Sequence, residues 1–281
     1  GAAASPGGKV IITRSTVSGT RASTTGPQPY GGGLLAAGGN VQASEVTLYG
    51  NTNFGVGADG TTGPAGASIT NSTITGTKKG SGTSSLVGGL ATAGTGALLA
   101  ASGTIDATNL TPDCGGAITD NGYNLASDTT CRLRAKGSRQ HAAAKLGTLV
   151  GHGGPTKTVL PGLTSPARNA IPFGKAGCVK GATDQRGKPR RSPAAGKCDI
   201  GSVEATVVNP RLRAKVVGHK AGGRYHGAVI VKYHCTVRSA RLTHKCPKPT
   251  HLRSHGKHHV KKTIHAVDGG TATVKLTITI S

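Results

Sequence analysis

The chain has 281 residues, with 46 Gly, no Met, no Trp and only two Phe. This length is sufficient for two domains and a sizeable core, but an aromatic core is excluded, so Val, Ile, Leu and Ala must fill the interior. A helical bundle would need fewer Gly and more Leu, Glu and Lys. Small residues interleaved with β-branched ones favour thin, stacked β-coils with tight turns. No window of 18 apolar residues occurs, which excludes a transmembrane helix.

Charge is distributed unevenly along the chain. Residues 1–130 contain five Lys or Arg and six acidic residues, whereas residues 131–281 contain 29 Lys or Arg, four acidic residues and all 11 His. This asymmetry predicts a nearly neutral N-terminal part joined to a cationic C-terminal part. Two interpretations remain open: a solvated basic surface, or attraction to a polyanion such as wall teichoic acid, acidic polysaccharide, anionic lipid or nucleic acid.

The N-terminal part contains internal repeats. A Thr-apolar-x-Gly pattern begins at Thr16, Thr47 and Thr73, at spacings of 31 and 26 residues, and GGGLLAAGG from Gly31 is echoed by VGGLATAGTG from Val87. Unequal periods are typical of coils with variable loops, and roughly four to six coils of about 20–30 residues would fit. We therefore expect residues 1–113 to be parallel β-helix coils, truncated at the N-terminus because no cap is visible there.

One glycine motif within these coils suggests a different function. GVGADG at 55–60 satisfies the dinucleotide-binding pattern G-x-G-x-x-G. However, no helical pattern follows it and the whole region is rich in Gly. The segment is predicted to be a turn between coils.

Residues 114–204 carry an ordered series of motifs. These are CGGAITDNGYNLASDTTC at 114–131, LGTLVGHGGPTKTVLPG at 146–162, SPARNA at 165–170, TDQRGKPR at 183–190 and CDIGSVE at 198–204. The series resembles the end of the bacterial choice-of-anchor Q domain proteins over about ninety residues. The resemblance implies a secreted or surface-attached protein with a right-handed parallel β-helix, whose last coils and disulfide-closed loops occupy 114–204. It implies no particular chemistry.

The six cysteines allow 15 disulfide connectivities. Nested spacing and the family resemblance favour three short loops, Cys114–Cys131, Cys178–Cys198 and Cys235–Cys246. An even number of cysteines used in this way argues for an oxidising, extracytoplasmic compartment. The rival interpretation is a metal site built from Cys235, His244 and Cys246 with His251 or His255, although a C-x-x-C spacing is lacking.

Residues 205–281 are predicted to form a separate basic β domain. HGAVIVKYHC at 226–235 and TATVKLTITI at 271–280 alternate apolar and polar residues, as expected of half-buried strands. The order of YHC, CP, GKHHV and AVD motifs resembles a bacterial Ig-like domain, which implies a spacer or adhesive module. The predicted fold class is therefore all-β, a right-handed parallel β-helix followed by a small Ig-like β-sandwich.

The basic run HLRSHGKHHVKKTIH at 251–265 is the candidate polyanion-binding segment. Its candidate contacts are Arg253, Lys257, His258, His259, Lys261 and Lys262. No aromatic residue interleaves the run, so base stacking is lacking and specific nucleic-acid binding is not expected. Binding should strengthen below about pH 6.5, where an imidazole gains charge.

Catalytic candidates are weak. Asp106, Asp113, Asp120 and Asp128 surround the first cysteine loop, a pattern that turn chemistry explains more simply. Asp184 and Arg186 could be an acid–base pair, but an ion pair that orders a loop is favoured. No catalytic residue, metal or cofactor is assigned. We expect an extracellular or cell-surface structural or adhesive protein that binds anionic cell-wall or extracellular polymers. The alternative is a polysaccharide lyase or hydrolase of β-helix type.

Overall fold

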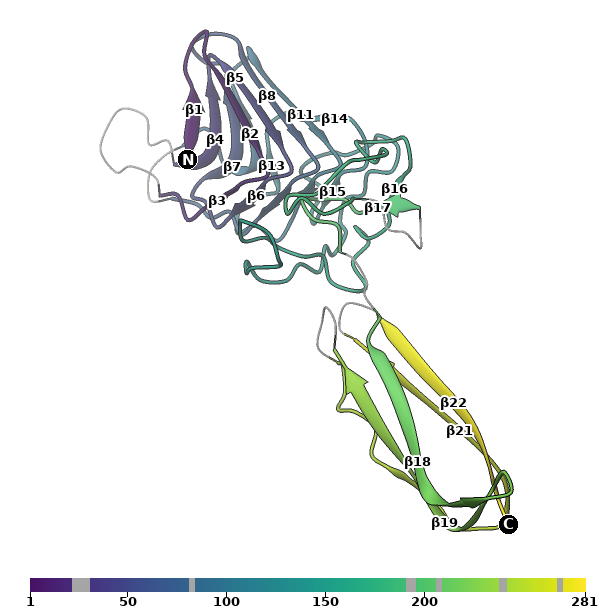
Figure 1. The fold of residues 1–281 in the computed structure, drawn as a ribbon. Helices are drawn as coiled ribbons and strands as arrows, with labels where there is room; N and C mark the ends of the chain where they lie inside the picture. The colour runs from purple at the N-terminus through teal and green to yellow at the C-terminus, as the bar shows by residue number, and fades with distance from the viewer. Residues whose placement is uncertain (22–30, 81–83, 191–195, 206–208, 238–241, 267–269) are drawn as a thin grey trace. The chain divides into compact units, whose positions relative to one another are not determined.

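The structure is a computed structural model that describes residues 1–21, 31–80, 84–190, 196–205, 209–237, 242–266 and 270–281 (Figure 1). The chain forms two compact units, Gly1–Ala205 and Thr206–Ser281, which are described separately. All the regular secondary structure in the described ranges is β-strand, with no helix among them, so the described part of the protein is all-β.

The N-terminal unit is built from five successive turns of chain, and each turn contributes one strand to each of three parallel sheets (Figure 1). Sheet A contains β1 (Ala2–Ala4), β4 (Gly32–Ala37), β7 (Phe54–Asp59), β10 (Gly88–Ala93) and β13 (Cys114–Gly115). Sheet B contains β2 (Lys9–Thr13), β5 (Asn40–Ser44), β8 (Ala65–Thr70), β11 (Ala97–Ser102) and β14 (Thr119–Asp120). Sheet C contains β3 (Thr16–Ser18), β6 (Thr47–Tyr49), β9 (Thr73–Thr75), β12 (Ile105–Asp106) and β15 (Leu125–Ala126). Three parallel five-stranded sheets are consistent with the predicted parallel β-helix.

The repeats seen in the sequence are stacked directly on one another. In sheet C, Thr16 pairs with Thr47 and Thr47 pairs with Thr73, so the apolar residues that follow these threonines also align. The glycine that ends each repeat has a positive φ, 67° at Gly19, 62° at Gly50 and 71° at Gly76. Glycine adopts this left-handed conformation without the steric cost of a Cβ, which allows the chain to leave the sheet at the same point in each coil.

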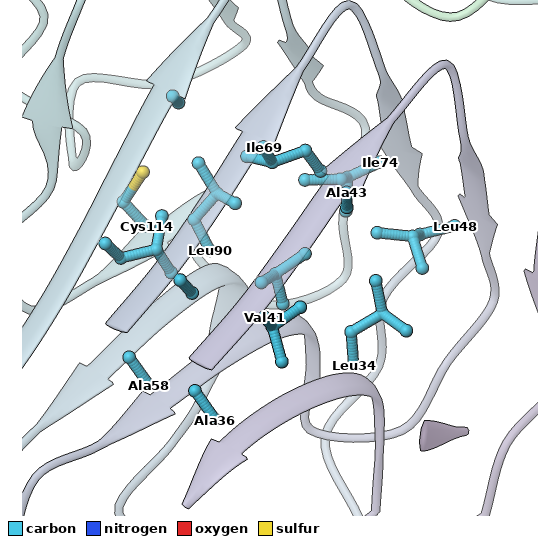
Figure 2. Close-up of a cluster of buried hydrophobic side chains, with 14 of the residues drawn as sticks. Leu34, Ala36, Val41, Ala43, Leu48, Ala58, Ile69, Ile74, Leu90 and Cys114 are labelled. Atoms are coloured by element: carbon cyan, nitrogen blue, oxygen red, sulfur yellow. The ribbon is translucent and has the colours of Figure 1, made fainter. Parts of the chain in front are cut away.

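The interior between the sheets is aliphatic and narrow. Figure 2 shows Leu34, Val41, Leu48, Ile69, Ile74 and Leu90 gathered in it, and all six are buried. Glycine makes the narrow interior possible: a Cβ on Gly33 would lie 2.8 Å from Leu48 Cδ2, and one on Gly55 would lie 2.5 Å from Ile74 Cγ2. The coils are therefore thin because glycine in sheet A faces a larger side chain from sheet C.

This packing corrects one prediction. GVGADG at 55–60 is not a turn between coils, because residues 55–59 belong to strand β7, whose six residues are all buried. Gly55 and Gly57 occur there because there is no room for a side chain, not because the chain reverses. Gly60 follows the strand directly.

The segment that follows the coils covers the outer face of sheet C. Gln185 accepts a hydrogen bond from Thr47 Oγ1 at 2.6 Å, and the backbone N–H of Ser202 donates to Thr73 Oγ1 at 3.0 Å. The segment contains two short strands, β16 (Ile171–Pro172) and β17 (Lys197–Cys198). A second apolar cluster packs Ile105 and Leu125 of sheet C against Ile171 of β16 and Ile200, which follows β17. The segment is thus part of the same compact unit as the coils.

Buried ion pairs fix this segment. Arg186 binds Asp184 at 2.7 Å, so this pair orders the TDQRG loop, as favoured from the sequence. Arg190 is fully buried and donates to Glu45 Oε2 at 2.6 Å, to Asp199 O at 2.8 Å and to Gly201 O at 2.9 Å. Glu45 lies in the second coil, so Arg190 connects residues that are 145 positions apart.

Three disulfides close the loops that the sequence favoured. Cys114 is bonded to Cys131, Cys178 to Cys198 and Cys235 to Cys246. Because the sulfurs of Cys235 and Cys246 are bonded to each other, neither is a thiolate ligand for a metal. Three disulfides indicate an oxidising, extracellular environment. The described residues include no helix that could cross a membrane.

The C-terminal unit consists of two antiparallel β-hairpins and a short extra strand. Strand β18 (Arg211–Ala221) pairs with β19 (Arg224–Thr236), which also pairs with β20 (Thr250–Leu252). Strand β21 (Gly256–His265) pairs with β22 (Thr271–Ile280) over its whole length. The two hairpins meet in parallel pairing at Tyr225 and Ile280. The predicted immunoglobulin-like topology stays a prediction.

Candidate polyanion-binding surface

The C-terminal unit has almost no negative charge to balance its cations. Residues 206–281 contain 15 Lys or Arg and nine His, but their one acidic residue is Asp268, which lies outside the described residues. The ion pairs of Asp184 and Glu45 both lie in the N-terminal unit. Residues 131–205 are also basic, but they contain three acidic residues and two of their arginines take part in those ion pairs. The C-terminal unit is therefore the part with the most uncompensated positive charge.

The first hairpin sorts its side chains by strand alternation. Ala214 pairs with Tyr233 and Val216 with Val231 on the face that contributes to the hydrophobic cluster of the unit. The residues between them lie on the opposite face, where Arg213 pairs with His234 and Lys215 with Lys232. We call this exposed surface the first basic face, formed by Arg211, Arg213, Lys215, Lys232, His234 and His251.

The second hairpin repeats the arrangement. Val260, Ile278 and Ile280 are buried, while Lys261 lies opposite Lys275 on the exposed side. His259 Nδ1 lies 3.2 Å from Thr277 Oγ1 on the same side, in hydrogen-bonding distance. We call this surface the second basic face, formed by Lys257, His259, Lys261, His265 and Lys275.

The six residues predicted from the basic run do not share one surface. Lys257, His259 and Lys261 lie on the second basic face. His258 and Lys262 alternate with them, are only partly exposed and lie on the side of the hydrophobic residues. His258 Nε2 lies 2.8 Å from the carbonyl oxygen of Ser254. Arg253 is exposed and follows β20 outside the strands. A run that is continuous in sequence is therefore divided by the two-residue period of the strand.

Of the first basic face, only His251 lies in the segment predicted from the sequence, and its other five residues were missed. Arg211, Arg213 and Lys215 are spaced two apart between apolar residues in RLRAKV, which is the pattern of a strand with one charged face. Lys232 and His234 have the same spacing in VKYHC. The alternation was available in the sequence, but the hairpin register that brings these cations together was not. For Lys275, alternation in TATVKLTITI predicts only a polar position on a half-buried strand, not the pairing with Lys261.

The carboxylates near the first disulfide are engaged in turns. Asp113 Oδ2 accepts hydrogen bonds from Ser127 Oγ at 2.7 Å and from the backbone N–H of Asp128 at 3.0 Å. Asp120 accepts from the backbone N–H groups of Gly122, Arg134 and Ala135. Partial burial acts to raise the pKa of Asp120, but the hydrogen bonds from Ser138 and Ala135 outweigh it and lower the pKa. These contacts are those of turn-capping carboxylates.

Asp106 is different because it lies in the interior of the coils. It pairs with Ile74 in sheet C, so it takes the position of an aliphatic side chain in the stack. It is 3% exposed and accepts a hydrogen bond from Asn109 Nδ2 at 2.8 Å. Burial, followed by the neighbouring carboxylate of Asp113, raises its pKa well above the usual range. The sulfurs of Cys114 and Cys131 lie nearby but are bonded to each other. Asp106 is therefore enclosed within the coils and is not part of an exposed surface.

The candidate site is thus a pair of exposed, cationic faces on the two hairpins of the C-terminal unit. A scan against protein-family models, a search of curated proteins and a search of solved structures each found no match for the chain.

Proposed function

We propose that the protein is an extracellular structural or adhesive protein that binds anionic cell-wall or extracellular polymers through its basic C-terminal unit. The choice-of-anchor Q assignment of the N-terminal unit and the Ig-like assignment of the C-terminal unit are part of the same proposal. One observation carries it: strands place cations in register on exposed faces of a unit whose described residues include no acidic side chain.

The cross-strand pairing supports a binding role. Lys215 lies opposite Lys232 and Lys261 lies opposite Lys275. Like charges directly opposite each other in a sheet destabilise it, by roughly 0.2–1 kcal/mol per pair. A chain of phosphate, sulfate or carboxylate groups lying over such a pair would remove this repulsion. The attraction would be screened by salt, because these side chains are exposed.

The N-terminal unit suits the role of a rigid spine. Its coils share one hydrophobic interior, and Arg190 and two disulfides fix the segment that follows them. The acidic residues described there are used in turns, paired with arginine or buried, which favours binding over the alternative of a polysaccharide-active enzyme.

The test is incubation of the purified, oxidised protein with heparin, polygalacturonate and neutral dextran, measuring bound protein against salt concentration and polymer size against time. We expect binding to the two anionic polymers, loss of binding as salt rises, and no change in polymer size. Equal binding to dextran, or binding that salt does not weaken, would contradict the proposal. Shortening of any polymer would favour the enzyme.

A further inference from the structure

The two basic faces lie on opposite sides of one hydrophobic core. Residues from both hairpins form a single cluster that includes Val229 and Val231 of β19, Val260 of β21, and Ile278 and Ile280 of β22. Each of these five is at most 7% exposed. The five strands belong to one sheet, in which the only described pair that joins the two hairpins is Tyr225 with Ile280. Because both hairpins bury their apolar residues in one cluster, we infer that the sheet folds over at this pair, which turns the two charged faces away from each other.

The two faces are electrostatically separate. Packed sheets lie roughly 10 Å apart, and lysine side chains extend outward from both layers. Their charged groups are therefore further apart than the Debye length of about 8 Å at physiological ionic strength. An anion bound on the first basic face would leave the charge of the second nearly unchanged. A single extended polymer chain could not lie on both faces without bending around the edge of the unit.

Each face offers cations in a regular array. Residues that share a face recur roughly every 6.8 Å along a strand, and neighbouring strands lie about 4.8 Å apart. The first basic face places Arg213, Lys215 and Lys232 in one such array. The second places Lys257, Lys261 and Lys275 in another. Each array can contact several anionic groups along one polymer chain.

We propose that the C-terminal unit is bivalent: its two basic faces bind two different anionic polymer chains, so that one protein molecule cross-links them. This inference rests on the proposed polyanion binding and adds to it a mechanical role, the joining of polymer chains. The bridging requires no second protein molecule, because both binding faces belong to one unit.

The experiment compares long heparin chains with a heparin tetrasaccharide, using the full oxidised protein. Light scattering with long heparin reports cross-linking, and calorimetry with the tetrasaccharide reports the number of binding sites. We expect scattering to rise to a maximum as heparin is added and then to fall when heparin is in excess. In that excess, too few protein molecules are available per heparin chain to join the chains into a network. The tetrasaccharide should bind without any rise in scattering.

Two variants each remove one face. The triple variant R213Q/K215Q/K232Q removes the first basic face, and K257Q/K261Q/K275Q removes the second. Each should lose about one tetrasaccharide per molecule and nearly all of the scattering, because one face cannot join two chains, while it retains binding to long heparin. The matched control is K220Q/K245Q/K248Q, which loses the same charge at exposed positions outside both faces. This control should scatter like the unaltered protein.

The outcomes separate the two proposals. If both single-face variants cross-link heparin as strongly as the control, bivalence is wrong although polyanion binding stands. If the unaltered protein binds neither form of heparin, the proposed function itself fails. Sedimentation of the protein without heparin provides a further check: a stable dimer that persists in both single-face variants, together with undiminished scattering, would assign cross-linking to dimerisation and overturn the inference.

Discussion

Lys215 lies directly opposite Lys232 in the antiparallel ladder of β18 and β19, on an exposed face. The described residues of the C-terminal unit include no acidic side chain that could neutralise this pair. This relationship predicts opposite effects of one substitution on stability and on binding. Lys215→Thr removes the repulsion and should stabilise the hairpin by roughly 0.2–1 kcal/mol. It should also reduce the salt dependence of heparin binding by about one unit of the log–log slope.

Amide hydrogen exchange of β18 and β19 measures the first effect, and heparin binding at several salt concentrations measures the second. Lys220→Thr is the control, because it removes the same charge at a position with no cation opposite. Since Lys220 Nζ lies 5.6 Å from the centre of the Tyr225 ring, this change should not stabilise the hairpin. A Lys215→Thr protein that is less stable than the unaltered one would show that the pair is not under repulsion.

A second prediction concerns pH. His234 lies on the first basic face and His259 on the second. Histidine is the side chain that most often changes charge in the physiological pH range. If the histidines contribute to binding, heparin affinity should rise from pH 8 to pH 5.5, and the rise should be smaller in H234Q/H259Q. The same affinity at both pH values in the unaltered protein would exclude a role for the histidines.

A third prediction concerns the segment that covers sheet C. Glu204 is 1% exposed, and its carboxylate accepts a hydrogen bond from the Asp199 N–H at 2.8 Å. Burial, and then the charge of Asp199, raises the pKa of Glu204 from 4.5 to about 8. The folded state therefore holds this proton more tightly than the unfolded state does. The stability contributed by Glu204 is fully present below about pH 4.5 and is lost as the pH rises to about 8.

Glu204→Gln keeps an acceptor oxygen but does not ionise. The variant should unfold in urea much like the unaltered protein at pH 4.5, and should become the more stable of the two, by on the order of a few kcal/mol, at pH 8. Urea midpoints of the N-terminal unit at the two pH values measure this. A constant difference between the proteins at both pH values would contradict the raised pKa.

A fourth prediction tests the glycines of sheet A. The Cβ of Gly55→Ala would lie 2.5 Å from Ile74 Cγ2, so the change should destabilise the N-terminal unit by roughly 1–3 kcal/mol. Gly151→Ala is the matched control, since a Cβ there would meet nothing within 4 Å. Combining Gly55→Ala with Ile74→Ala should cost less than the sum of the two single changes. Additive costs in urea unfolding would argue against the contact.

The coil architecture could be predicted because stacked coils produce a repeat in the sequence. Thr16, Thr47 and Thr73 align in sequence because they pair in sheet C. The role of Gly55 could not be predicted in the same way. Whether glycine marks a turn or a strand with no room for a side chain depends on the residue that faces it, here Ile74, and that residue comes from a different sheet.

The positive charge of the candidate site could be predicted from the sequence, but the arrangement of its cations on two faces could not. The composition located the cations in the C-terminal part, and alternation predicted the strands. Assigning Lys257 and Lys262 to different sides of the hairpin required the strand register, and pairing Lys215 with Lys232 required the hairpin partner. Long-range pairing of this kind is not encoded in any short segment.

The most direct test of the account is the salt dependence of heparin binding by the full protein and by a variant that combines the six substitutions R213Q, K215Q, K232Q, K257Q, K261Q and K275Q. The account predicts that the unaltered protein binds with a steep loss of affinity as salt rises, and that the six-fold variant has a much smaller slope and weaker binding at every salt concentration. An unchanged slope and affinity in the variant would show that heparin binds elsewhere, and would contradict the assignment of polyanion binding to the two basic faces.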